Sequence, residues 1–164
     1  MQIDDEAHGP AMLPLHPNQL WVLRVRGLIT AVPILLAAVM ADLGPLRETP
    51  VPPGAVGGGI LVALLASLIV LPPRRYRAWA YREEADELHI RSGLLVRSST
   101  VVPFGRVQHI DVTHGPVERR FGLATLVLHT AGTRGASVPL PGLLQAEAEA
   151  MRDRIRAKIR QDLV

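Results

Sequence analysis

The chain has 164 residues, a formal net charge of +3 at pH 7 and a mean hydropathy of +0.22, and only 20% of its residues are charged. It contains no cysteine, which excludes disulfides, thiolate chemistry and cysteine-ligated metals. The charge is distributed unequally, because residues 27–73 carry almost none and residues 74–164 carry most of it. This asymmetry predicts a membrane-embedded part joined to a water-soluble part.

The N-terminal segment, residues 1–17, begins acidic and continues rich in proline and histidine. It lacks the basic region followed by an apolar region that marks a secretory signal. Because the segment also shows no apolar periodicity, we expect a disordered tail over residues 1–17.

The first apolar run, residues 27–41, is uncharged but short for a hydrocarbon core of roughly 30 Å at ~1.5 Å per helical residue. A helix over residues 20–43 is long enough if Arg24 and Arg26 extend to the headgroups. Pro33 lies inside this run, and we expect it to kink a membrane helix rather than end it.

A second apolar run, residues 51–73, has no charge at all and predicts a span over about residues 54–73. The linker over residues 42–50 is short, so the two spans should form a helical hairpin over residues 18–75. Glycines at 57–59 either let the helices approach closely or only fray the start of the second helix. Neither run has the polar stripe of a helix in a soluble core.

Basic residues flank the outer ends of the predicted hairpin. They are Arg24 and Arg26 before the first run and Arg74, Arg75, Arg77 and Arg82 after the second. The linker has Arg47 against Asp42 and Glu48, so the positive-inside tendency predicts that both termini are cytoplasmic. The cluster after the second run lies at headgroup level, where it either binds anionic lipid or only sets the topology.

Residues 76–164 change to short strand-like runs separated by turn signals. The predicted strands lie at residues 77–82, 87–91, 94–102, 107–112, 123–130 and 136–140, with a turn at 133–135. Apolar residues at 144, 148, 151, 155 and 159 have helical spacing. We therefore predict an α+β soluble domain, an antiparallel sandwich or partly open barrel capped by a C-terminal amphipathic helix.

Several motifs in this soluble part carry a family resemblance. They are Trp79-x-Tyr81, Leu88-x-Ile90-x-x-Gly93, Thr100-Val-Val-Pro103, Arg106-Val-Gln108-His109-Ile-Asp111, Gly115-Pro116-x-x-Arg119-Arg120-x-Gly122, Thr130-Ala131-Gly132 and Pro141-Gly142. Together with two preceding spans, they make residues 20–159 resemble YdbS-type bacterial membrane proteins that have a pleckstrin-homology-like domain. The turn at residues 132–136 is shorter than in that family.

This resemblance implies a multi-pass protein of the bacterial plasma membrane with a pleckstrin-homology-like barrel on the cytoplasmic face. It implies no assigned catalysis and no cofactor, and it does not imply phosphoinositide binding. The motif residues are expected to be structural.

A histidine and aspartate group, His109, Asp111 and His114, has a spacing at which a divalent ion is conceivable. No clear fourth ligand accompanies it, so hydrogen-bonded strand histidines are the expected arrangement. Hydrolysis would need a nucleophile elbow and an oxyanion hole, and the sequence shows neither motif. We therefore predict no catalytic residues and no metal site.

The connector segment with Glu118, Arg119 and Arg120 has two interpretations. Arginine presents a planar fork to carboxylates and phosphates, so the segment is a candidate site for an acidic partner or a lipid. It is alternatively a solvated turn whose arginines bond to Asp111 or to a carbonyl. Gln108 is expected to satisfy buried backbone groups.

The functional hypothesis from the sequence is a non-enzymatic scaffold or adaptor that assembles with another membrane subunit or with itself. The alternative is a module that binds anionic lipid headgroups, and a metal-dependent or hydrolytic enzyme is the remaining, disfavoured class. Nucleic acid is not an expected partner, because one face of the basic C-terminal helix is needed for the core.

Overall fold

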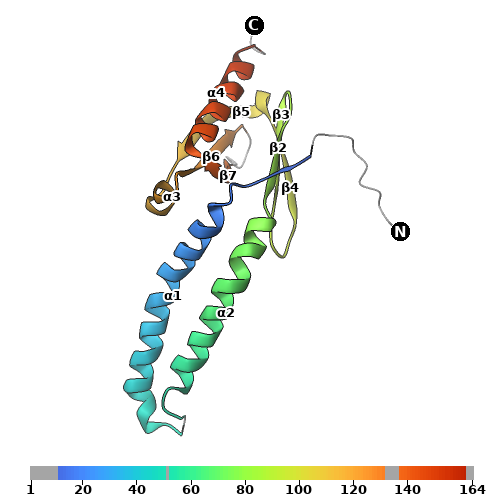
Figure 1. Cartoon of the computed structure of the whole chain (residues 1–164). Helices are drawn as coiled ribbons and strands as arrows, with labels where there is room; N and C mark the ends of the chain where they lie inside the picture. Colours follow the sequence, from blue (N-terminus) through green and yellow to red (C-terminus); the bar gives the residue numbers. More distant parts are fainter. Residues whose placement is uncertain (1–10, 51, 132–136, 162–164) are drawn as a thin grey trace, which may run out of the picture.

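The protein consists of a helical hairpin and a β-rich domain joined end to end (Figure 1). A computed structural model describes residues 11–50, 52–131 and 137–161. In the hairpin, α1 (Gln19–Leu43) and α2 (Ala55–Arg77) are both long and apolar enough to cross a membrane. Large apolar side chains on both helices are exposed, among them Leu36 at 58% and Ile69 at 69%. This exposure is typical of lipid-facing helices and unlike that of core helices in soluble proteins.

The helix ends agree with the sequence prediction except at one point. Pro33 lies within α1 without ending it. The predicted second span stops at residue 73, whereas α2 continues through Pro72 and Pro73 to Arg77. Prolines are tolerated in membrane helices because neighbouring structure satisfies the freed backbone groups. The extra turn contains Arg74, Arg75 and Arg77, so these arginines are part of the helix itself, just beyond its apolar part.

At the far end of the hairpin, a buried carboxylate joins the two helices. The backbone N–H of Gly57 in the first turn of α2 donates to Asp42 Oδ2 at 2.6 Å, and Asp42 is 8% exposed. A negative charge is favourable at a helix N-terminus. A Cβ on Gly57 would lie 2.9 Å from that oxygen, whereas Gly58 and Gly59 have open space. Close approach of the helices therefore requires the first of the three glycines only.

The segment before α1 corrects the prediction of a disordered tail over residues 1–17. Its strand β1 (Leu13–Pro14) pairs with β2 (Ala80–Glu83), and Leu15 is 2% exposed in the core. Tyr76 Oη donates to the carbonyl of Leu15 at 2.8 Å. The few apolar residues of this segment are interrupted by prolines and make a run too short to predict a strand, so its ordered structure was not expected from the sequence. Residues 1–10 lie outside the described residues.

The domain contains two antiparallel sheets with the strand orders β1-β2-β3-β4 and β5-β6-β7. The remaining strands are β3 (Glu87–Ser92), β4 (Ser98–Pro103), β5 (Val107–Thr113), β6 (Leu123–Thr130) and β7 (Ser137–Leu144). Since β1 precedes the hairpin and β2 follows it, the hairpin is inserted between two paired strands. Both helices therefore meet the domain at the same end (Figure 1).

The C-terminal helix α4 (Gln145–Gln161) covers the core, as predicted from its helical spacing. Ala148, Met151 and Ile155 are buried against residues of both sheets. On its outer side, Arg154 Nη2 donates to Glu83 Oε2 at 2.7 Å, and this hydrogen bond is the main cause that raises the pKa of Arg154. The predicted fold class, an α+β domain with antiparallel strands and a helical cap, is confirmed.

Local differences from the predicted elements occur at turns and prolines. Trp79 precedes β2 instead of lying in it, although it still packs on the core together with Tyr81. The last strand passes through Pro139 and Pro141 to Leu144, where the prediction ended it at residue 140. The connector after β5 is a short helix, α3 (Pro116–Arg120). The turn predicted at residues 133–135 lies outside the described residues.

The contact at Gly57 makes a testable prediction about the hairpin. Gly57→Ala should lower the free energy of unfolding by about 1–3 kcal/mol, because the added methyl overpacks the site that holds Asp42. Gly58→Ala is the matched control and should be neutral or stabilising, since its Cβ meets open space and alanine favours helix. Thermal unfolding of both variants in one detergent measures the difference, and equal melting temperatures would contradict the packing described.

Candidate functional site

The turn between β3 and β4 reaches beyond the sheet toward the hairpin. Ala80 at the start of β2 pairs with Arg91 of β3, so residues 93–97 extend past β2 to the level of the end of α2. Figure 1 shows this turn beside the domain end of α2. Gly93 has a φ of 109°, and a Cβ there would lie 1.9 Å from the carbonyl oxygen of Val96. The turn therefore requires glycine at position 93.

Four arginines line an open cavity between this turn and α2. Arg74 and Arg77 come from the last turn of α2, and Arg91 and Arg97 come from the two sides of the β3–β4 turn. The cavity has a volume of ≈ 370 Å³ and is also lined by Ala78, Gly93 and Leu94. We call it the arginine pocket.

The charge of the arginine pocket is uncompensated within the described part of the chain. All four arginine side chains are exposed, and none forms an ion pair with a described acidic residue. Arginine forks bind carboxylate and phosphate oxygens in bidentate geometry. Four such groups around one cavity have the chemistry to hold an anion through several hydrogen bonds, at the level where the apolar part of α2 ends.

The sequence predicted two of these four arginines. Arg74 and Arg77 belonged to the predicted cluster, whereas Arg75 lies along a different cavity of ≈ 440 Å³ together with Arg26 and Trp79. Arg91 and Arg97 were missed, because their meeting with α2 depends on the register of β2 with β3. The sequence feature that could have pointed to Arg91 and Arg97 is their position on either side of a turn that contains Gly93 and three apolar residues.

The connector residues Glu118, Arg119 and Arg120 do not join the arginine pocket. They lie on α3, which packs beside α1 at the other side of the hairpin (Figure 1). Glu118 is 6% exposed and forms an ion pair with Arg26 of α1. The prediction that Glu118 contacts a partner or lipid is therefore wrong, because its carboxylate is inside the protein. Arg119 and Arg120 are exposed.

The glycine and proline before this connector are structural. A Cβ on Gly115 would lie 2.6 Å from Glu118 Oε2, and Pro116 is the first residue of α3, where its missing N–H costs nothing. Further along, Gly122 and Gly142 have φ values of 67° and 73°, which L-residues rarely adopt. A Cβ on Gly142 would lie 3.0 Å from Gln19 Cγ, and the N–H of His16 donates to the Gly142 carbonyl at 2.8 Å, so the start of α1 packs against the domain.

The predicted histidine and aspartate group forms in part. Asp111 Oδ1 lies 2.7 Å from His109 Nε2, and Asp111 Oδ2 lies 3.2 Å from His129 Nε2 on the neighbouring strand β6. His114 is not part of this group, and its Nδ1 has no hydrogen-bond partner among the described residues. The arrangement is an aspartate between two strand histidines, so Asp111 bonds to histidines and not to Arg119 or Arg120.

Other motif residues have backbone or surface positions. Gln108, which was expected to satisfy buried backbone groups, is exposed, as are Pro103 and Arg106. The carbonyl of Arg106 accepts a hydrogen bond from the N–H of Ala131 at 2.9 Å, near Thr130 at the end of β6. Gly132 lies outside the described residues.

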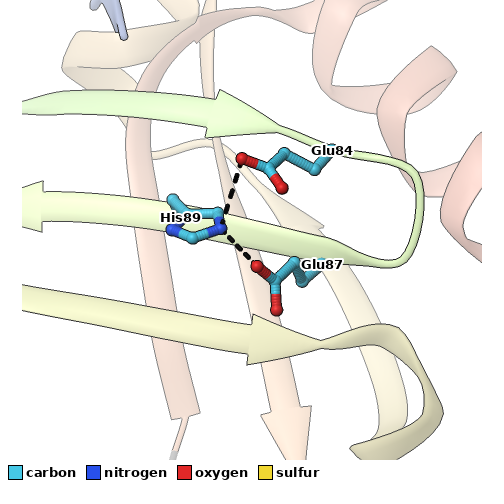
Figure 2. Close-up of side chains that lie close together, drawn as sticks. All are labelled: Glu84, Glu87 and His89. Atoms are coloured by element: carbon cyan, nitrogen blue, oxygen red, sulfur yellow. Dashed lines mark hydrogen bonds and ion pairs between the residues drawn. The ribbon is translucent and has the colours of Figure 1, made fainter. Parts of the chain in front are cut away.

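A cluster that the sequence analysis missed lies at the opposite end of β3. Glu84, Glu87 and His89 place one ligand atom each within 4.8 Å of one another (Figure 2). His89 Nε2 is 2.5 Å from Glu87 Oε1 and 3.6 Å from Glu84 Oε1. Three residues of metal-binding type thus converge at the β2–β3 turn.

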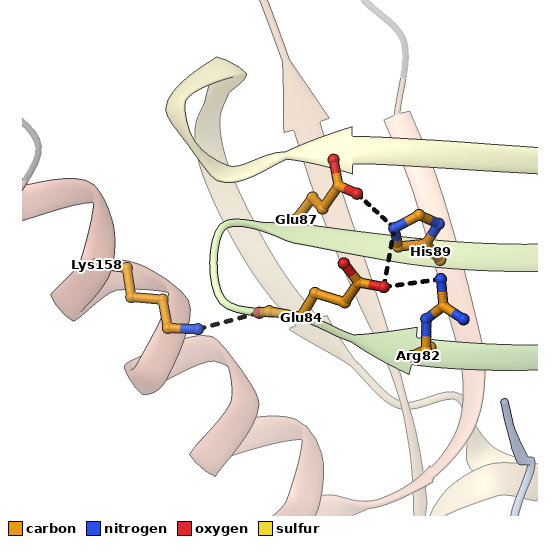
Figure 3. Close-up of polar contacts among 5 residues, drawn as sticks. All are labelled: Arg82, Glu84, Glu87, His89 and Lys158. Carbon is orange, nitrogen blue, oxygen red and sulfur yellow. Dashed lines mark hydrogen bonds and ion pairs between the residues drawn. The ribbon is translucent and has the colours of Figure 1, made fainter. Parts of the chain in front are cut away.

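Two basic side chains of the protein already bond to Glu84 of this cluster. Arg82 Nη2 donates to the same Glu84 oxygen at 2.7 Å, and Lys158 Nζ donates to the Glu84 carbonyl at 3.2 Å (Figure 3). A divalent ion at this oxygen would meet the guanidinium charge at close range. The cluster is therefore an ion-pair network that attaches α4 to the β2–β3 turn.

The two candidate membrane helices, the antiparallel sheets and the C-terminal helix are consistent with a membrane protein that has a pleckstrin-homology-like domain. Residues 28–159 match the Bacterial PH domain family, and the chain belongs to that family. It is 32% identical over 143 residues to UPF0699 transmembrane protein YdbS of Bacillus subtilis, a match that covers 86% of this chain and 88% of that protein.

A second relative is UPF0699 transmembrane protein YdbT of Bacillus subtilis, which is 29% identical over 106 residues. That match covers 64% of this chain but 21% of YdbT. No solved structure matches the chain. The family and the two candidate transmembrane helices agree with the resemblance deduced from the motifs.

The ion pair between Arg26 and Glu118 predicts how the domain is held on α1. Glu118→Gln should lower the free energy of unfolding by about 1 kcal/mol, because it weakens the hydrogen bond to Arg26 but leaves that guanidinium, 56% exposed, in contact with solvent. Adding Arg26→Gln should then cost little more, since the two side chains act as a pair. Thermal unfolding in detergent measures both effects. Glu48→Gln in the exposed loop is the control, and additive losses would contradict the pairing.

Proposed function

We propose that this protein is a membrane-anchored, non-enzymatic module whose arginine pocket binds the phosphate of anionic lipid headgroups. The observation that supports it is the gathering of Arg74, Arg77, Arg91 and Arg97 around one cavity at the end of a candidate membrane helix. The same cavity is rimmed by apolar atoms of Leu94, so a ligand there has both a charged and an apolar neighbour. A phospholipid has both of these features.

The proposed orientation follows from charge. Arg24 and Arg26 lie near the domain end of α1, and the last turn of α2 contains three arginines. The loop at the far end has Arg47 together with Asp42 and Glu48. Under the positive-inside tendency the domain and both termini would lie in the cytoplasm, and the two helices would make the protein multi-pass in the plasma membrane. The arginine pocket would face the anionic inner leaflet.

The free energy expected from this interaction between the arginines and the anionic leaflet is moderate. A basic residue near an anionic leaflet contributes about 1 kcal/mol, and the contribution decays within a Debye length, about 8 Å at physiological salt. All four arginines are exposed, so added salt should weaken the attraction. Binding by the arginine pocket therefore selects among lipids in the surrounding bilayer and does not anchor the protein, which the two helices do.

The test removes pocket charge without touching the arginines that set topology. The double variant Arg91→Gln, Arg97→Gln should reduce the preference for phosphatidylglycerol over phosphatidylcholine several-fold, because each arginine contributes about 1 kcal/mol at most. Native mass spectrometry of the full chain in mixed-lipid nanodiscs measures that preference.

The matched control for this test is Arg119→Gln, Arg120→Gln, which removes the same charge from α3. It should leave the lipid preference close to that of the original chain. Equal losses in the two double variants would show a non-specific charge effect and would contradict a pocket.

A second candidate function is the adaptor suggested by the sequence, in which another membrane subunit or a second copy binds the protein. It is supported by the exposed Arg119 and Arg120 on α3 and by the open space at Gly58 and Gly59 on α2. Small residues on a lipid-facing helix permit close helix association. Both surfaces lie away from the arginine pocket, so the two functions are compatible.

Crosslinking in native membranes, followed by mass spectrometry, tests the adaptor function. We expect crosslinks from α3 or from the start of α2 to one recurring partner. Arg119→Gln, Arg120→Gln should weaken crosslinks that involve α3. Recovery of the chain only as a partnerless monomer would contradict this function.

A further inference from the structure

Among the described residues of the domain, the tip of the β3–β4 turn has the most exposed large apolar side chains. Leu95 is 96% exposed and Val96 is 81% exposed, and Leu94 beside them is 40% exposed. Consecutive large apolar side chains at a turn are unfavourable in water, where turns are normally polar. We refer to residues 94–96 as the apolar tip.

The position of the apolar tip beside the hairpin indicates that lipid is the surface against which the tip packs. Leu94 lines the arginine pocket together with Arg74 and Arg77, so the tip lies at the level of the last turn of α2. The apolar part of α2 ends at Leu71 to Pro73, immediately before these arginines. The tip is thus beside the zone where a membrane helix passes from acyl chains to headgroups. Figure 1 shows the turn next to that end of α2.

The residues around the apolar tip match a lipid interface. Arg91 in β3 and Arg97 just before β4 flank the tip, and their long side chains can keep the guanidinium in the headgroup layer while the tip goes deeper. Elements that lie in the interface generally have this combination of an apolar face with basic residues beside it.

We propose that the apolar tip inserts into the bilayer at the boundary between headgroups and acyl chains, and so forms a third membrane contact beside the two helices. This extends the proposed function, on which it rests only for the placement of the hairpin in the membrane. Insertion clamps the domain against the leaflet and holds the arginine pocket at phosphate level. The apolar tip is thus proposed to contact lipid and not a protein partner, and quenching by a nitroxide lipid distinguishes the two.

The absence of cysteine makes the test direct. Leu95→Cys provides the only thiol in the full chain, and it can carry an environment-sensitive fluorophore. The labelled chain is placed in phosphatidylcholine nanodiscs, and quenching is compared for a lipid with a nitroxide on its acyl chain and for aqueous iodide. The matched control is Ala85→Cys in the exposed β2–β3 turn, at the other end of β3.

The expected result is strong quenching by the nitroxide lipid at position 95, with at least several-fold protection from iodide relative to position 85. Equal access of iodide to both positions would overturn the proposal, because the tip would be in water. Protection from both quenchers would also overturn it, because a protein would then cover the tip. If the Leu95 variant does not fold, Val96→Cys tests the same insertion.

This outcome is separate from that of the arginine pocket. The nanodisc lipids are zwitterionic and carry no net charge, so insertion should persist in the Arg91→Gln, Arg97→Gln background. Insertion without any anionic lipid preference would contradict the proposed headgroup binding alone. Anionic preference with a water-exposed tip would contradict only the insertion.

Discussion

The pairing of β1 with β2 is the constraint on which the arrangement of the molecule depends. It places one strand before the helical hairpin and its partner directly after it, so both helices must return to the same end of one sheet. Burial of Leu15 and the hydrogen bond from Tyr76 to its carbonyl hold the incoming chain against the domain. The ion pair of Arg26 with Glu118 attaches α1 at a second point. The domain is thereby held close to the helix ends.

That attachment explains why charge and apolar surface gather where they do. Since the sheet begins where α2 ends, the register of β2 with β3 carries the β3–β4 turn back alongside the last turn of α2. Arg91 and Arg97 thus meet Arg74 and Arg77, and the apolar tip is exposed at the same level. The opposite end of β3 has its charges paired, among Arg82, Glu84 and His89. The two ends of one strand are therefore suited to membrane and to water.

Much of the architecture could be predicted, because it depends on local patterns. The apolar runs gave both helices to within a few residues, and the alternation of residues 87–91 and 107–112 gave β3 and β5. The spacing of Ala148, Met151 and Ile155 gave the buried face of α4. Only two of the four pocket arginines, Arg74 and Arg77, were predicted. The other two lie in or beside a turn more than a dozen residues further along the chain.

The amino-acid sequence by itself determined which segments are apolar helices, which are strands, and to which family the chain belongs, because hydropathy, periodicity and turn residues act between near neighbours. Tertiary structure alone decided that residues 11–17 are ordered against the domain and that Glu118 is buried in an ion pair with Arg26. It also decided that four arginines line one pocket. Each of these depends on contacts between distant residues. Strand register and helix docking set such contacts, and no local pattern encodes them.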